Sequence, residues 1–248
     1  MSRYRAASLH FIASVFFLFI IFSFVHLVWY PGKLFMAASG GEIMLILLLV
    51  DMTIGPLITL VIFNVNKPSL KFDMATVLTF QILFVVYGVW VMFSARPVYM
   101  AFVDQRFQLV TANEISSADQ KKAKNSEFRK LPLWGPITIG TELPDDKQIV
   151  EDMLFTSLSG MGPQNYPEYF VKYDDIRQTV ISAALSAEQV KKQEIDEEQK
   201  QFLIKYSKEN TSKKTKILFV PLITKQKVLY VAIDGQNADI LELLEFEE

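Results

Sequence analysis

The sequence predicts a membrane protein with three transmembrane α-helices followed by an α+β extracytoplasmic domain. The windows 8–29 and 74–94 contain no Asp, Glu, Lys or Arg, and the window 43–63 contains one acid, Asp51. A helix that crosses the hydrocarbon core needs about 20 apolar residues. The remainder of the chain carries 19 basic and 24 acidic residues, which is typical of a water-soluble domain. We therefore expect a three-span domain, 1–96, and an α+β domain, 97–248.

The composition excludes several classes of protein. The 248 residues include no Cys, which rules out disulfides, Cys nucleophiles and Cys-ligated metal or iron–sulfur centres. A formal net charge of −2 argues against nucleic-acid binding. His10 and His26 lie 16 positions apart, about 24 Å along one helix, so they cannot share a metal ion. We expect each of them to be a packed or interfacial histidine.

The first span is read as an uncleaved anchor. It ends at Trp29 and Tyr30, whose rings favour the membrane interface. Pro31 and Gly32 then break the helix. A cleaved signal peptide is the alternative, but its apolar region normally runs to only about 7–15 residues.

The basic residues that flank the three spans predict the orientation. Four lie on one side of the membrane, and these are Arg3, Arg5, Lys67 and Lys71. Only Lys33 and Arg96 lie on the other side. Because cytoplasmic loops carry the excess of Lys and Arg, we expect a cytoplasmic N-terminus. Three crossings of the bacterial inner membrane then place 97–248 in the periplasm.

Asp51 is the sharpest candidate residue in the spans. A carboxylate inside a membrane helix costs about 3 kcal/mol and usually faces protein or water. We favour a packing role, with the hydroxyls of Tyr87 and Ser23 at a similar depth as its partners. Proton or ion relay is the alternative, although it needs a chain of titratable groups. Gly55 and Pro56, in the same span, predict a kink.

Strands and helices alternate in the domain 97–248. Two strands, 98–103 and 106–111, flank a tight turn at Asp104 and Gln105. The turn is followed by a charged helix at 116–130, a loop with several prolines, a helix at 145–158 and a loop at 159–167.

The last third of the domain begins with a long polar helix at 186–208. Ser186 and Gln189 can form a capping box at its start, and the pairs Glu188–Lys192 and Asp196–Lys200 support it at i,i+4 spacing. A hairpin of 217–223 and 227–234 precedes a final segment, 238–246. We read the charged helix as a solvated surface rather than a coiled-coil arm.

The sequence predicts no enzyme active site, no metal site and no cofactor. It contains no nucleophile elbow, phosphate-binding loop, zinc-protease motif, dinucleotide fingerprint or EF-hand loop. No spacing of the acidic residues supports an active site built from two carboxylates. The segment Arg96-Pro97-Val98-Tyr99 could orient the domain or hold a partner, or it could place Arg96 at the headgroups and Tyr99 at the interface.

Several strings resemble the TfpX/TfpZ family of type IV pilin accessory proteins. They are Trp29-Tyr30-Pro31-Gly32, Leu48-Leu49-Val50-Asp51, Gly55-Pro56-Leu57, Ser69-Leu70-Lys71-Phe72-Asp73, Arg96-Pro97-Val98-Tyr99, then Asp104, Arg106 and Phe107, and Leu218-Phe219-Val220-Pro221-Leu222. The resemblance is densest between residues 29 and 107. The middle of the chain, 112–215, contributes little to it.

This resemblance implies a non-enzymatic inner-membrane protein that is paired with one major type IV pilin and helps that pilin reach the pilus. It brings no catalytic residues. The candidate structural or partner-binding residues are Trp29, Tyr30, Pro31, Gly32, Asp51, Gly55, Pro56, Tyr87, Arg96, Pro97, Tyr99, Asp104 and Arg106. The alternatives are a membrane sensor, or a small envelope transporter or transferase that uses Asp51. We expect the partners to be the pilin and the lipid bilayer, with no nucleic acid.

Overall fold

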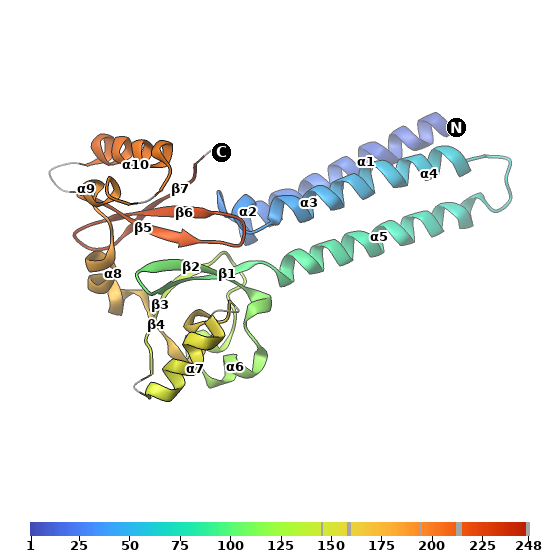
Figure 1. The fold of residues 1–248 in the computed structure, drawn as a ribbon. Coiled ribbons are helices and arrows are strands. Elements are labelled where there is room, and N and C mark those ends of the chain that lie inside the picture. The colour runs from blue at the N-terminus through green and yellow to red at the C-terminus, as the bar shows by residue number, and fades with distance from the viewer. Residues whose placement is uncertain (145, 158–159, 194, 212–214, 247–248) are drawn as a thin grey trace. The chain divides into compact units, whose positions relative to one another are not determined.

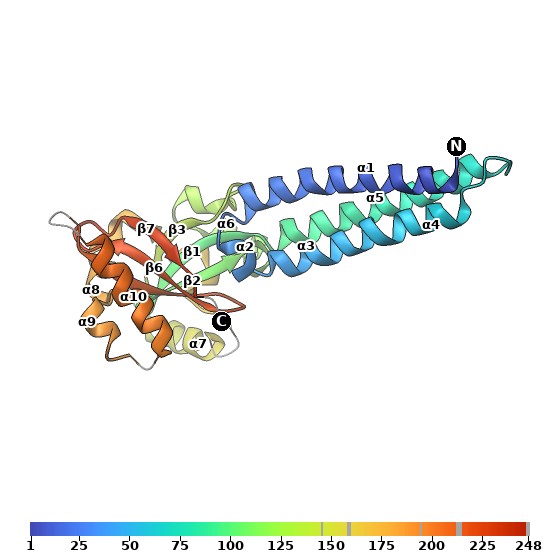
Figure 2. The ribbon, with the colours of Figure 1, turned by 90° about the horizontal axis from the view of Figure 1, so that it is seen from above.

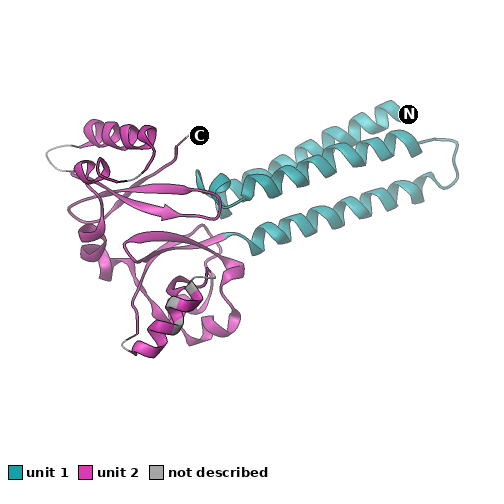
Figure 3. Ribbon diagram, viewed as in Figure 1, with its two compact units in different colours: residues 1–96 teal, residues 97–248 magenta. Residues whose placement is uncertain are grey.

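The computed structural model describes residues 1–144, 146–157, 160–193, 195–211 and 215–246. They form two compact units, Met1–Arg96 and Pro97–Glu248 (Figure 3). The first unit is built from long apolar helices, and the second is a mixed β-sheet with helices. The predicted fold class is therefore confirmed.

Three helices of the first unit are long and apolar enough to cross a membrane. They comprise 27, 23 and 25 residues. The first span consists of α1 (Arg3–Phe24) and a π-helical turn (Val25–Trp29). The second consists of α3 (Gly40–Leu49), a π-helical turn (Val50–Ile54) and α4 (Gly55–Ile62). The third is α5 (Leu70–Ser94). A short helix, α2 (Leu34–Ala37), lies between the first two spans. The first helix begins earlier than predicted because the Ser2 hydroxyl caps it, accepting from the Arg5 N–H at 3.4 Å.

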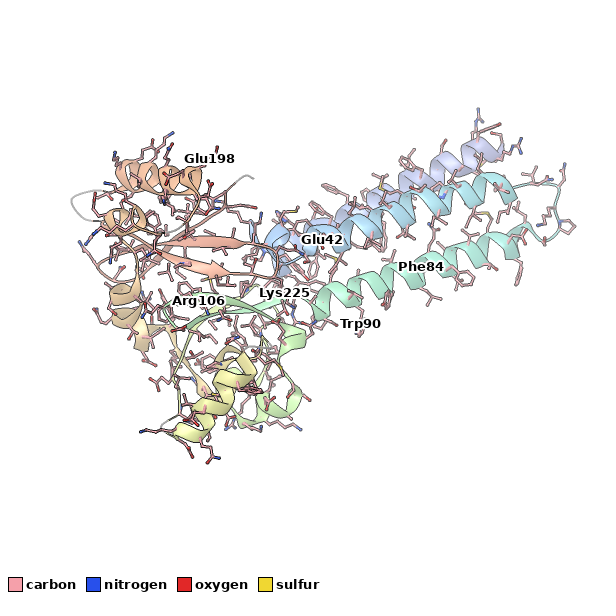
Figure 4. The ribbon with its side chains drawn as sticks, viewed as in Figure 1. Glu42, Phe84, Trp90, Arg106, Glu198 and Lys225 are labelled. Carbon is pink, nitrogen blue, oxygen red and sulfur yellow. The ribbon has the colours of Figure 1, made fainter. Side chains whose placement is uncertain are left out.

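The second span packs against both of the others within this unit. Helix α4 contacts α1 and α5, and α3 contacts α5 (Figures 1 and 2). Gly88 permits one close approach, because a Cβ there would lie 2.8 Å from Leu47 Cδ1. Most of the remaining apolar side chains point outward, including Phe84 and Trp90 on α5 (Figure 4). Such a surface suits a hydrocarbon environment.

The second unit is organised around one seven-stranded sheet with the order β4-β3-β1-β2-β5-β6-β7. The strands are β1 (Pro97–Val103), β2 (Arg106–Thr111), β3 (Ile137–Thr141), β4 (Phe170–Lys172), β5 (Ile217–Ile223), β6 (Val228–Asp234) and β7 (Ile240–Leu244). The pairs β1/β3 and β2/β5 are parallel, and the other neighbours are antiparallel. The predicted hairpins at Asp104-Gln105 and between β5 and β6 are confirmed.

The sheet is nearly split between β2 and β5. Among the described residues of β2, Phe107 and Gln108 alone pair with β5. Beyond them, Leu185 takes the place of β2 and exchanges two backbone hydrogen bonds with Phe219, at 2.8 and 2.9 Å. The next residue on this edge of β5 is Pro221, which has no N–H to leave unpaired. Each half of the sheet consequently has a core of its own.

The two cores are formed by different segments of the unit. One surrounds β1 and β3 and includes Tyr99, Phe128 and Phe170. The other surrounds β5 and β6 and includes Phe219 and Leu203. The helices of this unit are α6 (Ser117–Lys122), α7 (Lys147–Ser157), α8 (Arg177–Ala183), α9 (Ala187–Val190) and α10 (Glu197–Asn210).

Two predicted helices are wrong in length. The helix expected at 116–130 ends at Lys122 and is followed by a separate 3-10 turn, Ser126–Arg129. The helix expected at 186–208 is divided into α9 and α10. Asp196 begins the second of these by accepting from the Glu198 N–H at 2.8 Å.

The predicted capping box of Ser186 and Gln189 is confirmed, but the ion pairs differ from those expected. Lys191 pairs with Glu188 and Lys200 with Glu197 at i,i+3 spacing, and Lys205 pairs with Glu209 at i,i+4 spacing.

In the second unit, the strands β3 and β4 and the helix α8 were not predicted. The two strands are short, and prolines lie close before each of them. Their pairing with β1 and with each other, rather than local propensity, makes them strands. Residues 145 and 158 of the expected helix at 145–158, residue 159 of the loop that follows it, residue 194 of the polar helix and residues 247–248 lie outside the described residues.

Candidate functional site

Asp51 lies in the π-helical turn of the second span and is buried, with 3% of its surface exposed. In a π turn the hydrogen bonds run from residue i to i+5. The partner of the Asp51 carbonyl would therefore be the N–H of residue 56, and Pro56 has none. Gln81 on α5 supplies a substitute, because its side-chain amide donates to the Asp51 carbonyl oxygen at 3.5 Å. The expected kink at Gly55-Pro56 thus takes the form of a widened turn.

The oxygen of the Gln81 side-chain amide takes part in a chain of hydrogen bonds that connects all three spans. Gln81 Oε1 lies 2.6 Å from His10 Nε2 on α1, and His10 Nδ1 lies 2.6 Å from the Thr59 hydroxyl on α4. An amide oxygen only accepts, so His10 Nε2 carries a proton and donates it. In the neutral imidazole, Nδ1 then accepts from Thr59. We call His10, Thr59 and Gln81 the intramembrane polar cluster.

Gly55 makes room for this cluster. A Cβ at position 55 would lie 1.9 Å from Gln81 Nε2, far inside any real contact. Glycine at this position is therefore required for the Gln81 side chain to reach both the Asp51 carbonyl and His10.

The expected partners of the Asp51 carboxyl group are wrong. Tyr87 is 63% exposed, and the Ser23 hydroxyl donates to the carbonyl of Phe19 on its own helix at 2.8 Å. Asp51 Oδ1 is buried and has no hydrogen-bond partner among the residues that the structure describes.

The sequence analysis missed the polar cluster because it considered His10 by itself and did not consider Thr59 or Gln81. His10, Thr59 and Gln81 are polar, uncharged side chains in otherwise apolar windows, and that pattern was the signal that could have found them. His26, by contrast, stacks on Phe22 with the ring centroids 5.6 Å apart, as a packed histidine does. Within the described parts of the chain, no group of three His, Asp or Glu residues could hold a metal ion.

An aromatic cluster joins the last turns of the first and third spans. The Tyr30 hydroxyl, fully buried, donates to the Met92 carbonyl at 2.9 Å. The Trp29 and Phe93 rings lie 5.2 Å apart. Arg96 donates to the Phe93 carbonyl at 2.6 Å, and its guanidinium lies 3.9 Å from the centroid of the Phe93 ring.

The turn after Tyr30 allows this arrangement. Pro31 ends the helix, and Gly32 adopts a φ of 58°, a left-handed conformation that glycine adopts without strain. Trp29, Tyr30 and Arg96, which the sequence singled out separately, therefore belong to one cluster.

Tyr99 belongs to the core of the second unit, so the alternative that placed its ring at the membrane interface is wrong. It is 1% exposed, and its ring meets the Phe170 ring edge-on at 5.1 Å. Its hydroxyl is buried without a hydrogen-bond partner among the described residues. Burial raises the pKa of Tyr99 to about 12. Pro97, at the start of the same strand, pairs with Thr111.

Asp104 and Arg106 lie at the exposed β1–β2 turn (Figure 4 labels Arg106). Asp104 and Gln105 both have positive φ, 48° and 63°, the geometry of a type I′ hairpin turn. This turn borders a cavity of about 950 Å³ in the second unit.

The chain is similar over nearly its whole length to two curated proteins of Dichelobacter nodosus. It is 20% identical to the fimbrial assembly protein of serogroup I and 19% identical to that of serogroup E1. Each match covers 98% of this chain and 95% of the relative. No family model and no solved structure matches the chain. Both the membrane unit and the α+β unit thus take part in the similarity.

Proposed function

We propose that this protein is a non-enzymatic accessory protein of type IV pilus assembly, which binds one major pilin and promotes its stability or its incorporation into the pilus. The observation that carries the proposal is the similarity to fimbrial assembly proteins over 98% of the chain. A similarity that includes the three spans as well as the α+β unit supports a role in pilus assembly for the whole molecule. The more specific family, the TfpX/TfpZ pilin accessory proteins, is part of this proposal.

The two-unit architecture supports a partner that is itself membrane-bound. A subunit awaiting assembly at the membrane would present an apolar segment to the bilayer and a folded part to the aqueous side. Three spans and an α+β domain on one chain offer a contact to each part. Once one contact has formed, the second is intramolecular, and its effective concentration is raised accordingly.

The proposed location is the bacterial inner membrane, with the N-terminus in the cytoplasm and 97–248 in the periplasm. The support is the excess of basic residues, four against two, on the side of the N-terminus. Fusions of alkaline phosphatase and of a fluorescent protein that folds only in the cytoplasm, each placed after Glu248, test this. We expect phosphatase activity without fluorescence, and the reverse pattern would overturn the proposed meeting with pilus subunits.

The binding proposal is tested by co-purification. The tagged full chain, extracted in mild detergent, is expected to retain the major pilin of its own strain and not an unrelated pilin expressed in its place. Deletion of the gene is expected to reduce the amount of surface pili. Absence of association, together with normal piliation after deletion, would contradict the proposal.

The buried carboxyl group of Asp51 is the observation that favours the rival function, proton-linked transport. The substitution Asp51→Asn separates the two functions, because it keeps the shape of the side chain and removes its titration. We expect normal piliation in this variant. Lost piliation at a normal protein level would favour relay instead.

A further inference from the structure

The loop before β3 presents two large apolar side chains at its tip. Trp134 is 71% exposed and Leu133 is 57% exposed, and we call these two residues the apolar tip. Leu131, at the base of the loop, packs against the first core. Pro132 and Pro136 flank the tip and fix their own φ angles. The tip is therefore held clear of the core on a stiff support, and adjacent exposed apolar side chains mark a contact with a protein or a membrane.

The strand register places the apolar tip at the end of the sheet that is joined to α5. Strand β3 runs parallel to β1, and Ile137 pairs with Tyr99. Continued two residues back, this register would set position 135 beside Pro97, at the roughly 5 Å spacing of paired strands. Trp134 precedes that level. The tip thus lies at the end of β1 where the chain leaves the third span.

The length of α5 sets that point at the lipid headgroups. The uncharged window 74–94 has 21 residues and is about 31 Å long as a helix, which matches the hydrocarbon thickness of about 30 Å. Ser94 therefore lies at the hydrocarbon boundary when α5 crosses a bilayer. Pro97 follows three residues later, so it lies within about 11 Å of that boundary. This limit comes from the covalent chain and holds for every orientation of the second unit.

The segment before the loop carries positive charge. Five exposed basic side chains lie in 121–130 with one acid, Glu127, whereas 97–248 as a whole has 19 basic and 24 acidic residues. We call 121–130 the basic segment. Its Phe128 ring meets the Tyr99 ring edge-on, with the centroids 6.3 Å apart, so the segment is fixed at the same end of β1 as the apolar tip. Basic and apolar side chains together attach proteins to the surface of an anionic membrane.

We propose that the apolar tip inserts into the interface of an anionic phospholipid bilayer beside the end of the third span, with the basic segment over the headgroups. The indole ring of Trp134 suits this depth, because amphipathic rings favour the boundary between hydrocarbon and headgroups. This second attachment fixes the orientation of the second unit on the membrane, which one covalent connection does not fix by itself. The inference requires α5 to cross the bilayer and does not depend on the proposed pilin.

The first test measures depth with a fluorophore. The chain has no Cys, so a single label can be attached to the full-length protein through Leu133→Cys. The protein is reconstituted in vesicles of phosphatidylethanolamine and phosphatidylglycerol, with and without a lipid that carries a nitroxide just below its headgroup. We expect the nitroxide to quench this label and to spare a label at Gln105→Cys, in the exposed turn at the opposite end of β1. Any other pattern would overturn the proposal.

The second test separates insertion of the tip from simple closeness to the span. The label is moved to Lys130→Cys, and the tip is changed beside it. Leu133→Ser combined with Trp134→Ser should abolish the quenching, because no apolar side chain of the tip remains to enter the bilayer, whereas Trp134→Phe should retain most of it. Phe155→Ser, which removes an exposed ring on α7, is the matched control and should leave the quenching unchanged.

Circular dichroism should report the same fold for all of these variants, because the side chains they change are exposed. If the quenching survives loss of the tip, the connection to the span alone explains it and the proposal fails. The proposal also fails if Phe155→Ser abolishes the quenching equally.

The third test addresses the charge of the lipid. Replacing phosphatidylglycerol by phosphatidylcholine should weaken the quenching at position 130, because the attraction of the basic segment to anionic lipid is lost. Equal quenching in the two kinds of vesicle would overturn the assignment to anionic lipid.

Discussion

Gly55 and Gln81 offer the sharpest test of the membrane unit. The substitution Gly55→Ala adds a Cβ that would lie 1.9 Å from Gln81 Nε2. Because the contact is with the end of a flexible side chain, the helices can stay in place, but the Gln81 amide must move. It then loses its hydrogen bonds to the Asp51 carbonyl and to His10.

The expected magnitude follows from those two hydrogen bonds. Interhelical hydrogen bonds in membranes contribute about 0.6 kcal/mol each, and a group left unpaired costs about 1–3 kcal/mol. Against this loss, alanine is better than glycine in a helix by about 0.5–1 kcal/mol. We expect Gly55→Ala to lower the free energy of unfolding by about 1–4 kcal/mol in the wild-type background. In a Gln81→Ala background the obstruction is gone, and the same substitution should raise it by about 0.5 kcal/mol.

The assay is unfolding of the full chain in mixed micelles with increasing dodecyl sulfate, followed by circular dichroism, for the wild type, both single variants and the double variant. The control is Gly88→Ala, which meets Leu47 instead. Its cost should be the same with and without Gln81, because sites about 10 Å apart along a helix are additive. If Gly55→Ala has the same cost in both backgrounds, within about 0.5 kcal/mol, the contact with Gln81 does not explain the glycine.

Three further predictions concern single side chains of the full chain. Tyr30→Phe removes the hydrogen bond to Met92 and should cost about 1 kcal/mol of unfolding free energy, whereas Tyr87→Phe, at an exposed position, should cost nothing measurable; detergent unfolding compares the two. Tyr99→Phe removes a buried hydroxyl without a partner among the described residues and should be neutral or stabilising. Burial raises the pKa of Tyr99 from 10.0 to about 12, so its ionisation does not affect the free energy of unfolding below pH 10, and that free energy falls as the pH rises from 10 toward 12 because only the unfolded state ionises there. Urea titrations over that range should show a steeper loss in the wild type than in Tyr99→Phe. Finally, Gln105→Gly should stabilise the β1–β2 turn by about 0.5–1 kcal/mol, because Gln105 has a φ of 63°; an unchanged or lower urea midpoint would contradict this.

The spans and the main hairpins could be predicted because their signals are local. A charge-free run of about 20 mostly apolar residues is unfavourable when it is exposed to water, so it predicts a span. A two-residue turn between two strands of alternating apolar and polar residues sets the register in which those strands pair. The divided polar helix was less predictable. Its charge pattern is continuous across 186–208, but Val190 and Leu203 are both fully buried in the second core, and the chain bends at Asp196.

For the candidate site residues too, local signals could be read from the sequence and tertiary contacts could not. Trp29, Tyr30 and Arg96 were marked by the strings that carry the family resemblance and by their residue types, which are common at the ends of spans. Their convergence on Phe93 and Met92 requires the first and third spans to end side by side. The partners expected for Asp51 were wrong because depth along a helix does not say which way a side chain points.

The sequence by itself determined where the chain becomes apolar enough to enter a bilayer, because the free energy of transferring a residue to hydrocarbon depends on that residue and its near neighbours. It likewise determined the α+β character of 97–248. Only the tertiary structure decided that His10, Thr59 and Gln81 meet, that Leu185 fills the gap beside β5, and that Gln164 Oε1 is buried without a hydrogen-bond partner among the described residues. Each of these depends on side chains from elements far apart in the chain, whose approach is set by packing and by the pairing of backbone groups, and no local pattern records it.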